Sequence, residues 1–312
     1  MFKIRENYKN FYWCDHLRTY NLKKYTNSYG NNEILYLGQP KLKFIDKFFN
    51  KRKIYIDFEE PNRISSLKFN SKIADLWKGG DYDYQFQKIF SICPYTSDWL
   101  NEINANQKRS SIFHPTNEDL ITTSPFKDID IIYTGNIHGM KKNILEDILK
   151  PITKFKHRII SSFGESKLVT DKNITNKKKF ELLGRSKISI MQFLLFPDQN
   201  AIKTYKCIKN INKNKAFDFI DMGIIPQMKS RPFEAAFSKT LMLVRSDQFN
   251  LIEKYFNPND HFIYFNDENL EKLVRDILKN FYKYEKIVND AYEFASKKYS
   301  RIHFLSKVLS SN

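Results

Sequence analysis

The sequence predicts an α/β protein built on parallel β-sheets, and three observations carry this prediction. From residue 127 onward, short apolar segments alternate with segments of helical periodicity, which is the pattern of strands joined by crossover helices. Hydrophobic residues make up 41% of the 312-residue chain and include 27 Phe and 18 Tyr, enough for a sizeable core. Gly and Pro are scarce, at 9 and 10 residues, which excludes collagen-like and linker-rich architectures.

The first part of the chain predicts two strands and a helix. Residues 53–58 are rich in β-branched and aromatic side chains and predict a strand, and residues 88–93 predict a second strand that a proline closes. We expect Ser97 to cap a helix that begins at Asp98. Residues 105–127 are polar and contain two prolines, so we expect a linker between two domains there.

The second part of the chain shows a clearer alternation of elements. Its strands are continuous apolar runs, as expected in a parallel sheet that is covered on both faces. The predicted strands are 129–134, 155–162, 187–193, 240–244 and 261–265. The predicted helices are 140–150, one that ends at 180–186, 230–238, 249–256, 268–280 and a helical segment over 281–309.

The charge balance is strongly basic. The chain carries 52 Lys and Arg against 35 Asp and Glu, a formal net charge of +17, of which residues 127–312 hold +12. Two interpretations remain open: an AT-rich coding sequence that favours lysine codons, or an anionic partner such as a phosphorylated substrate, an acidic membrane surface or nucleic acid. The three cysteines have no paired spacing, which argues against a disulfide scaffold and favours a reducing compartment.

The sequence offers no signal for secretion or membrane insertion. The first ten residues contain no apolar core of a secretory signal, and no apolar run approaches the roughly 20 residues of a membrane span. We therefore expect a cytoplasmic protein, with peripheral attachment to the inner face of the membrane left open.

The most informative segment is 225–236, where a short strand and a loop run into a helix. Ser230 is placed to cap this helix, and Arg231 to Glu234 form its first turn. A helix start presents free N–H groups and a positive dipole end, which suit a diphosphate. Lys229 and Arg231 would add charge-assisted contacts to the same anion, and Glu234 could accept hydrogen bonds from a ribose diol. A capped helix that serves stability alone is the alternative.

The order of units around this segment resembles the carboxy-terminal, nucleotide-sugar-binding half of GT-B glycosyltransferases. The likeness is closest to the bacterial "glycosyl transferases group 1" type, which includes CgeB-like proteins. It rests on an Arg-x-Phe-Glu-Ala helix at 231–235, followed by an apolar strand, a helix and an aromatic strand, and it covers about residues 127–280. Met242 stands where many retaining members carry a second glutamate, and Ser238 and Lys239 stand where the family often has Cys-Gly.

This resemblance implies a fold of two Rossmann-like domains with doubly wound parallel sheets. Residues 1–126 would bind the acceptor, residues 127–280 would bind the nucleotide sugar, and the helices of 281–312 would cross back to the first domain. The helix start at Ser230 would do the work of a metal ion on the departing diphosphate, so no cofactor is expected beyond the nucleoside-diphosphate sugar that serves as donor.

The resemblance also implies roles for individual residues. Glu234 would hold the donor ribose, and Arg231 with Lys229 would bind the diphosphate. Gly135 and Asn136 would line the donor cleft, because a turn without a side chain lets the backbone approach the ligand. The basic residues that follow this turn either reach phosphate or form a solvated helix start; they are His138, Lys141 and Lys142.

The general base that deprotonates the acceptor hydroxyl would lie in the first domain. Asp57, Glu59 and Glu60 are the first candidates, because active-site groups favour strand ends and adjacent carboxylates raise one another's pKa. An acidic turn exposed to solvent is the alternative interpretation. The turn at 93–98 is a second candidate, and His16 is a third.

Several other patterns in the sequence point less specifically to a function. Two Asp-x-Asp pairs, at 81–83 and 128–130, match metal-dependent transferases, but this spacing is common by chance and we expect no metal site. The lysines at 203, 206, 209 and 213 share one helical face, either as a solvated surface or as a contact for acidic lipid, a phosphorylated acceptor or nucleic acid. The glycine motifs of dinucleotide oxidoreductases and P-loop enzymes are absent from the sequence.

Together these observations predict a metal-independent glycosyltransferase that moves a sugar to a hydroxyl of a glycan or lipid-linked glycan, in the synthesis of a polysaccharide. Two alternatives stay open. One is a transferase that modifies DNA bases, for which nucleic acid would be the partner, a less favoured one. The other is a non-catalytic nucleic-acid- or surface-binding protein on the same scaffold, because folds are reused for unrelated functions.

Overall fold

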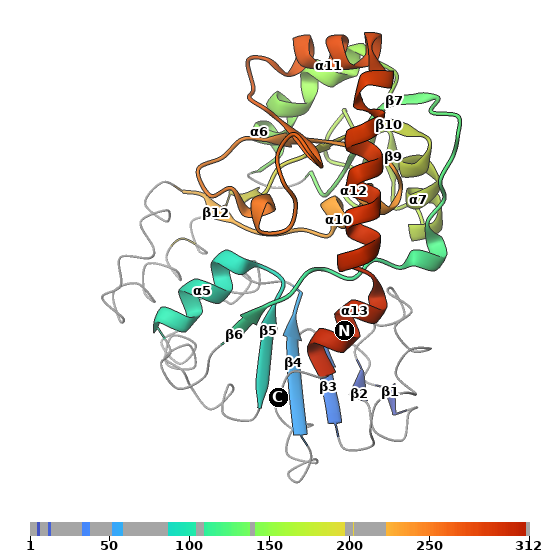
Figure 1. Cartoon of the computed structure of the whole chain (residues 1–312). Helices are drawn as coiled ribbons and strands as arrows, with labels where there is room; N and C mark the ends of the chain where they lie inside the picture. The colour runs from blue at the N-terminus through green and yellow to red at the C-terminus, as the bar shows by residue number, and fades with distance from the viewer. Residues whose placement is uncertain are drawn as a thin grey trace. The chain divides into compact units, whose positions relative to one another are not determined.

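A computed structural model describes most of the second half of the chain and selected elements of the first (Figure 1). The described residues are 5–6, 12–13, 33–37, 52–58, 87–103, 109–137, 141–196, 202 and 223–309. The chain separates into two compact units, the first comprising Met1–His114, Leu194–Met228 and Arg301–Asn312 and the second comprising Pro115–Phe193 and Lys229–Ser300. Each unit is assembled from segments that are distant in sequence.

The second unit is built on a six-stranded sheet in the order β14-β13-β10-β7-β8-β9, and every neighbouring pair is parallel. Its strands are β7 (Ile129–Thr134), β8 (His157–Ser161), β9 (Asp171–Lys172), β10 (Ser186–Met191), β13 (Leu241–Arg245) and β14 (Phe262–Phe265). Ile188 is in register with Ile131 on one side and with Leu241 on the other, so the apolar runs form the centre of the sheet. The α/β class and the parallel sheet expected from the sequence are confirmed.

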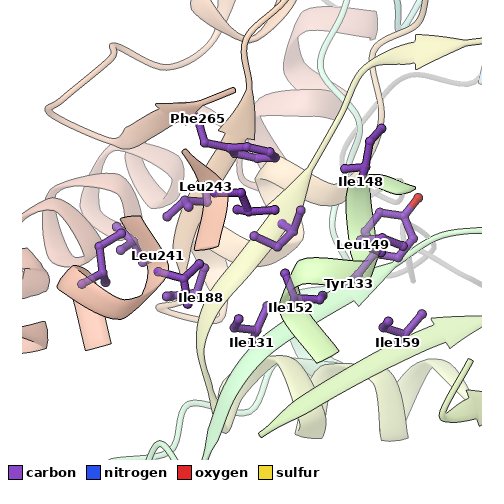
Figure 2. Packing of buried hydrophobic residues seen from close by; sticks show 14 of the residues in the cluster. Ile131, Tyr133, Ile148, Leu149, Ile152, Ile159, Ile188, Leu241, Leu243 and Phe265 are labelled. Atoms are coloured by element: carbon purple, nitrogen blue, oxygen red, sulfur yellow. The ribbon is translucent and has the colours of Figure 1, made fainter. Parts of the chain in front are cut away.

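Helices cover this sheet on both faces. They are α6 (Lys141–Leu149), α7 (Asn176–Gly184), α10 (Arg231–Phe237), α11 (Leu270–Lys279) and α12 (Glu285–Lys298), with 3₁₀ turns at Glu118–Leu120, Lys150–Lys154, Leu251–Lys254 and Phe281–Tyr284. Because neighbouring side chains of a strand point to opposite faces, Ile131 and Tyr133 pack in one core cluster (Figure 2), and Ile132 packs in another with Phe180 and Leu183 of α7.

The first unit contains a second parallel sheet, in the order β3-β4-β5-β6. Its described elements are β3 (Glu33–Leu37), β4 (Arg52–Asp57), β5 (Lys88–Ser91), α5 (Pro94–Ile103), β6 (Arg109–Ser111) and α13 (Arg301–Leu309), with short antiparallel pairs of β1 (Arg5–Glu6) with β2 (Tyr12–Trp13) and of β11 (Leu194–Leu195) with β12 (Ile225–Pro226). The ring of Phe304, on α13, lies 6.4 Å from that of Phe58 and 5.7 Å from that of Phe113. The last helix of the chain therefore packs in the first unit.

The expected cap of the helix after β5 was wrong. Helix α5 begins at Pro94, and Ser97 lies inside its first turn, where its N–H donates to the carbonyl of Cys93 at 3.0 Å. Proline suits the first position of a helix because its φ is preset and its missing N–H would have no partner there. The proline that seemed to close a strand is thus the start of a helix.

The segment expected to be a linker contains a strand. Residues 109–111 form β6, which pairs in parallel with β5, and the side-chain amide of Asn101 bonds both backbone groups of Arg109. This strand is short and polar, so a strand could not be predicted here from hydrophobic patterning.

The helix expected over 249–256 is reduced to the 3₁₀ turn Leu251–Lys254. Asp247 accepts the N–H groups of Phe249 (2.8 Å) and Asn250 (3.2 Å), and Asn250 adopts a left-handed backbone with φ of 47°. Both features are incompatible with a regular helix that starts at residue 249.

None of the helices within the described residues is long and apolar enough to cross a membrane.

Candidate functional site

A polar turn follows β7 at the carboxyl edge of the second unit's sheet. Asn136 Oδ1 accepts the N–H of Ser162 at 3.0 Å, and Ser161 Oγ accepts the N–H of Ile137 at 3.2 Å. These bonds hold the turn that begins at Gly135 against the end of the neighbouring strand β8. In open parallel sheets, ligands bind at this edge.

Helix α10 places Arg231 beside this turn. The helix precedes β13 and leads to the amino edge of the sheet, so its first residue lies at the carboxyl edge. The Arg231 guanidinium carbon is 4.9 Å from the centre of the Tyr133 ring, and Nη1 is 3.4 Å from the Tyr133 hydroxyl. A Cβ at Gly135 would lie 2.6 Å from the same guanidinium carbon, so the glycine leaves the room that the guanidinium occupies. The structure thus brings Gly135, Asn136 and Arg231 to one edge of the sheet.

The environment of Arg231 differs from that of the other arginines in the second unit. The other four each pair with a carboxylate: Arg158 with Asp171, Arg185 with Asp128, Arg245 with Asp267 and Arg275 with Glu271. Among the described residues, Arg231 has no carboxylate partner, and the Tyr133 hydroxyl is its one hydrogen-bond acceptor. A guanidinium that is held in place but not neutralised is suited to bind a carboxylate or phosphate ligand through its in-plane N–H groups.

Glu234 lies one turn further along α10 and is paired with a lysine that the sequence reasoning had not assigned. Lys179 Nζ, on α7, is 2.8 Å from Glu234 Oε1, and the two side chains are only 20% and 9% exposed. The pair therefore joins two opposite charges in a largely buried setting. Lys179 is the third of three consecutive lysines, and only the packing of α7 on α10 distinguishes it from its neighbours.

The expectation that Ser230 caps α10 with its side chain was wrong. Ser230 occupies the N-cap position, but its backbone is already helical, with φ of −69° and ψ of −23°, and its side chain makes no capping hydrogen bond. The helix has seven residues, and Pro232 contributes no N–H to its first turn. An anion at this end of α10 would therefore be held chiefly by side chains, with the half-buried Lys229 directly before the helix.

The candidates for a general base are only partly within the described residues. Asp57 is the last residue of β4, whereas Glu59, Glu60 and His16 lie outside the described residues. In the alternative turn, Cys93 is buried and its sulfur accepts the N–H of Met228 at 3.4 Å, so it is held in the protein interior.

Other basic candidates are also only partly described. Lys142 lies in the first turn of α6, which begins at Lys141, while His138 and the lysine-rich stretch 203–215 lie outside the described residues.

The Asp-x-Asp pair at 128–130 lies at the amino edge of the sheet, away from Arg231. Asp128 makes two hydrogen bonds to the Arg185 guanidinium, which hold the pKa of its carboxyl below the usual range. Asp130 pairs with Lys187 at 2.9 Å. These carboxylates stabilise the start of β7. Among the described residues, no group of three His, Cys, Asp or Glu side chains is placed to hold a metal ion.

Comparison with known structures identifies the fold. HepE of Anabaena, in complex with UDP and glucose, is 8% identical with a TM-score of 0.60, and the match covers 93% of this chain and 80% of HepE. A glycosyltransferase of Rickettsia africae is 14% identical with a TM-score of 0.54, covering 99% and 83% of the two chains. TarM of S. aureus is 12% identical with a TM-score of 0.55; the match covers 93% of this chain but only 57% of the length of TarM.

Sequence comparison identifies the family. No curated protein matches the chain. A family profile described as "Glycosyl transferase-like" matches residues 142–310, more than half of the chain, and this range contains Lys179, Arg231 and Glu234. The chain therefore belongs to the glycosyl transferase-like family, and its fold is that of glycosyltransferases of the GT-B kind.

Proposed function

We propose that the chain transfers a sugar from a nucleoside-diphosphate sugar to a hydroxyl of a glycan or lipid-linked glycan, without a metal ion. In this proposal the two units form the two Rossmann-like domains of a GT-B enzyme. The second unit binds the donor, and the first unit, which includes Leu194–Met228 and the last helix α13, binds the acceptor.

The observation that carries the proposal is the environment of the Arg231 side chain. It is a fixed guanidinium at the carboxyl edge of a parallel sheet, beside a glycine turn, without a carboxylate partner among the described residues. An anionic ligand completes such a site. HepE, which shares the fold, has been seen with UDP-glucose. A nucleoside diphosphate is therefore the anion that we assign to Arg231.

The donor-binding residues divide the work of transfer. Arg231 and Lys229 bind the diphosphate and offset the negative charge that grows on it as the sugar departs. Glu234, which is paired with Lys179, accepts hydrogen bonds from the ribose hydroxyls. The turn of Gly135 and Asn136 lines the donor cleft, where Gly135 leaves room for the Arg231 guanidinium, and Ser230 stands at the start of the helix that carries Arg231.

The reaction exchanges one bond at the anomeric carbon for another. The acceptor oxygen forms a bond to that carbon, and the bond from the carbon to the β-phosphate oxygen breaks, so the nucleoside diphosphate leaves with the electron pair. The proton of the acceptor hydroxyl passes to a base of the first domain, for which Asp57, Glu59 and Glu60 are the candidates.

The charge of the chain supports a location at an acidic surface. With a net charge of +17, we propose a cytoplasmic protein that attaches peripherally to the inner face of the membrane, where it would meet a lipid-linked acceptor and build a polysaccharide.

A thermal-shift panel tests the donor site. UDP, GDP, ADP, CMP, dTDP and their sugar conjugates are compared with wild type, Arg231→Ala and the matched control Arg275→Ala, which removes an exposed arginine paired with Glu271. A ligand at 100 times its dissociation constant stabilises by about 2.7 kcal/mol. We expect one nucleoside diphosphate to stabilise wild type and Arg275→Ala but not Arg231→Ala. Stabilisation of all three proteins would remove Arg231 from the site, and stabilisation of none would contradict the assigned function.

A further inference from the structure

We propose that Tyr133 is a positioning residue that orients Arg231 for the donor diphosphate. The inference deepens the proposed function and rests on it. Tyr133 itself would not touch the donor: its ring lies under the guanidinium carbon, and its hydroxyl accepts a hydrogen bond from Nη1. Both contacts come from one buried side chain on β7, while Arg231 comes from α10, about 100 residues later in the chain.

The support that Tyr133 provides is rigid. The side chain is 1% exposed and belongs to the main core cluster of the second unit. Its backbone is paired with Ile190 of β10 on one side and with Ile159 of β8 on the other. An arginine side chain loses rotamer entropy when it is immobilised. Because the ring holds the guanidinium before the ligand arrives, that cost is met in folding and not in binding.

An arginine that packs on an aromatic ring keeps more of its N–H groups available for a ligand than an arginine that is paired with a carboxylate. The four arginines that pair with Asp or Glu in this unit use their in-plane N–H groups for that pairing. The Arg231 guanidinium carbon lies over the Tyr133 ring, 4.9 Å from its centre, and the Tyr133 hydroxyl accepts from Nη1 alone. Within the described residues, the remaining N–H groups of Arg231 have no acceptor. The ring thus orients the cation and leaves both its charge and its binding edge available for two phosphate oxygens.

Gly135 leaves the space in which the Arg231 guanidinium packs on Tyr133. The Cβ of any other residue would collide with the guanidinium and would lie 2.9 Å from the Tyr133 hydroxyl. Tyr133 and Gly135 are two residues apart on the same strand and turn, so one segment supplies both the support and the space for Arg231.

The test uses isothermal titration with UDP, inorganic pyrophosphate and uridine. Tyr133→Leu removes the ring and the hydroxyl, Tyr133→Phe removes the hydroxyl alone, and each is made with and without Arg231→Ala. The matched control is Tyr292→Leu, which removes the ring that Lys239 contacts at 4.6 Å, at the other end of α10. Far-ultraviolet circular dichroism and melting temperature establish that each variant is folded.

We expect Tyr133→Leu to weaken UDP and pyrophosphate about tenfold, the range of a desolvated cation–π contact, and to leave uridine unchanged. Tyr133→Phe should weaken UDP by about threefold or less, and Tyr292→Leu should have no effect. In the Arg231→Ala background, Tyr133→Leu should cause no further loss, because the two residues act as one unit.

Two results would overturn the inference. An equal loss of UDP and uridine affinity in Tyr133→Leu, or an equal loss with and without Arg231, would show a purely structural role for the ring. If Tyr133→Leu does not fold, Tyr133→Phe serves as the test. The inference is then wrong if Tyr133→Phe weakens UDP binding equally with and without Arg231. The proposed function fails separately, when wild type binds neither UDP nor pyrophosphate nor any nucleoside diphosphate of the panel.

Discussion

At the scale of single residues, the site depends on what neighbouring atoms permit. Arg231 occupies its position because Gly135 has no Cβ and because Tyr133 presents a ring below it. A substitution of Tyr133 or Gly135, at the end of β7, can therefore act on an arginine that is distant in sequence. The effect on the ligand is indirect, through the guanidinium.

Gly135→Ala is expected to weaken UDP binding about tenfold, because its Cβ displaces the Arg231 guanidinium and so costs a charge-assisted contact. The protein should stay folded with a lowered melting temperature, because the Cβ also lies 2.9 Å from the buried Tyr133 hydroxyl. Titration calorimetry and thermal melting measure the two effects. The matched control is Gly164→Ala, whose Cβ would meet the flexible side chain of Lys172 at 2.8 Å. UDP affinity equal to that of wild type in Gly135→Ala would show that the guanidinium position is not used by the ligand.

At the scale of elements, helices α7 and α10 are joined at both ends by lysines. Near their carboxyl ends, Lys127 Nζ donates to the carbonyls of Gly184 (2.7 Å) and Lys239 (2.8 Å). Burial and the charge of Lys239 lower the pKa of Lys127 to about 8. Lys179 pairs with Glu234 and so links α7 to the first turn of α10, where Arg231 begins the helix. The two helices therefore carry the candidate site as one body.

Lys179→Met is expected to lower the free energy of unfolding by about 3 kcal/mol, because it leaves a buried carboxylate without its lysine. The double variant Lys179→Met/Glu234→Gln should recover part of this loss, since the carboxylate charge is removed as well. The adjacent Lys178→Met is the control: its pair with Glu181 is exposed, and we expect a change below about 0.5 kcal/mol. Urea unfolding measures the free energy of unfolding of each variant. If Lys179→Met is as stable as Lys178→Met, the ion pair of Lys179 with Glu234 contributes nothing to stability.

At the scale of the whole molecule, charge is the property that stands out. The net charge of +17 remains after the ion pairs of the second unit have formed, because those pairs are balanced. A surface of this charge is attracted to anionic lipid by about 1 kcal/mol for each Lys or Arg near the membrane, and salt screens the attraction.

The protein is expected to sediment with vesicles of phosphatidylglycerol and phosphatidylcholine at 50 mM salt, to be released at 500 mM salt, and to ignore vesicles of phosphatidylcholine alone. Duplex DNA is added as a competitor. Failure to bind the anionic vesicles at low salt would contradict membrane attachment, and complete displacement by DNA at equal charge concentration would favour a nucleic-acid partner.

The sequence by itself determined the class of the fold and the order of its elements. The strands at 129–134, 187–193 and 240–244 were found within a few residues of β7, β10 and β13, because a strand buried on both faces must be apolar throughout. Hydrophobic patterning did not predict β6, which is polar and whose residue Arg109 is bonded by the Asn101 side chain. It also predicted a full helix over 249–256, where Asp247 accepts the N–H of Phe249 and a regular helix does not form.

Only the tertiary structure decided what surrounds the candidate residues. The sequence pointed to Arg231 and Glu234 as a pair in one helical turn, but it could not show that Tyr133 supports the first and Lys179 neutralises the second. These partners come from β7 and α7, and local periodicity carries no information about which strand and helix meet across a crossover. The physical reason is that hydrophobic patterning is read within one element, whereas ion pairs and cation–π contacts are set by the packing of several.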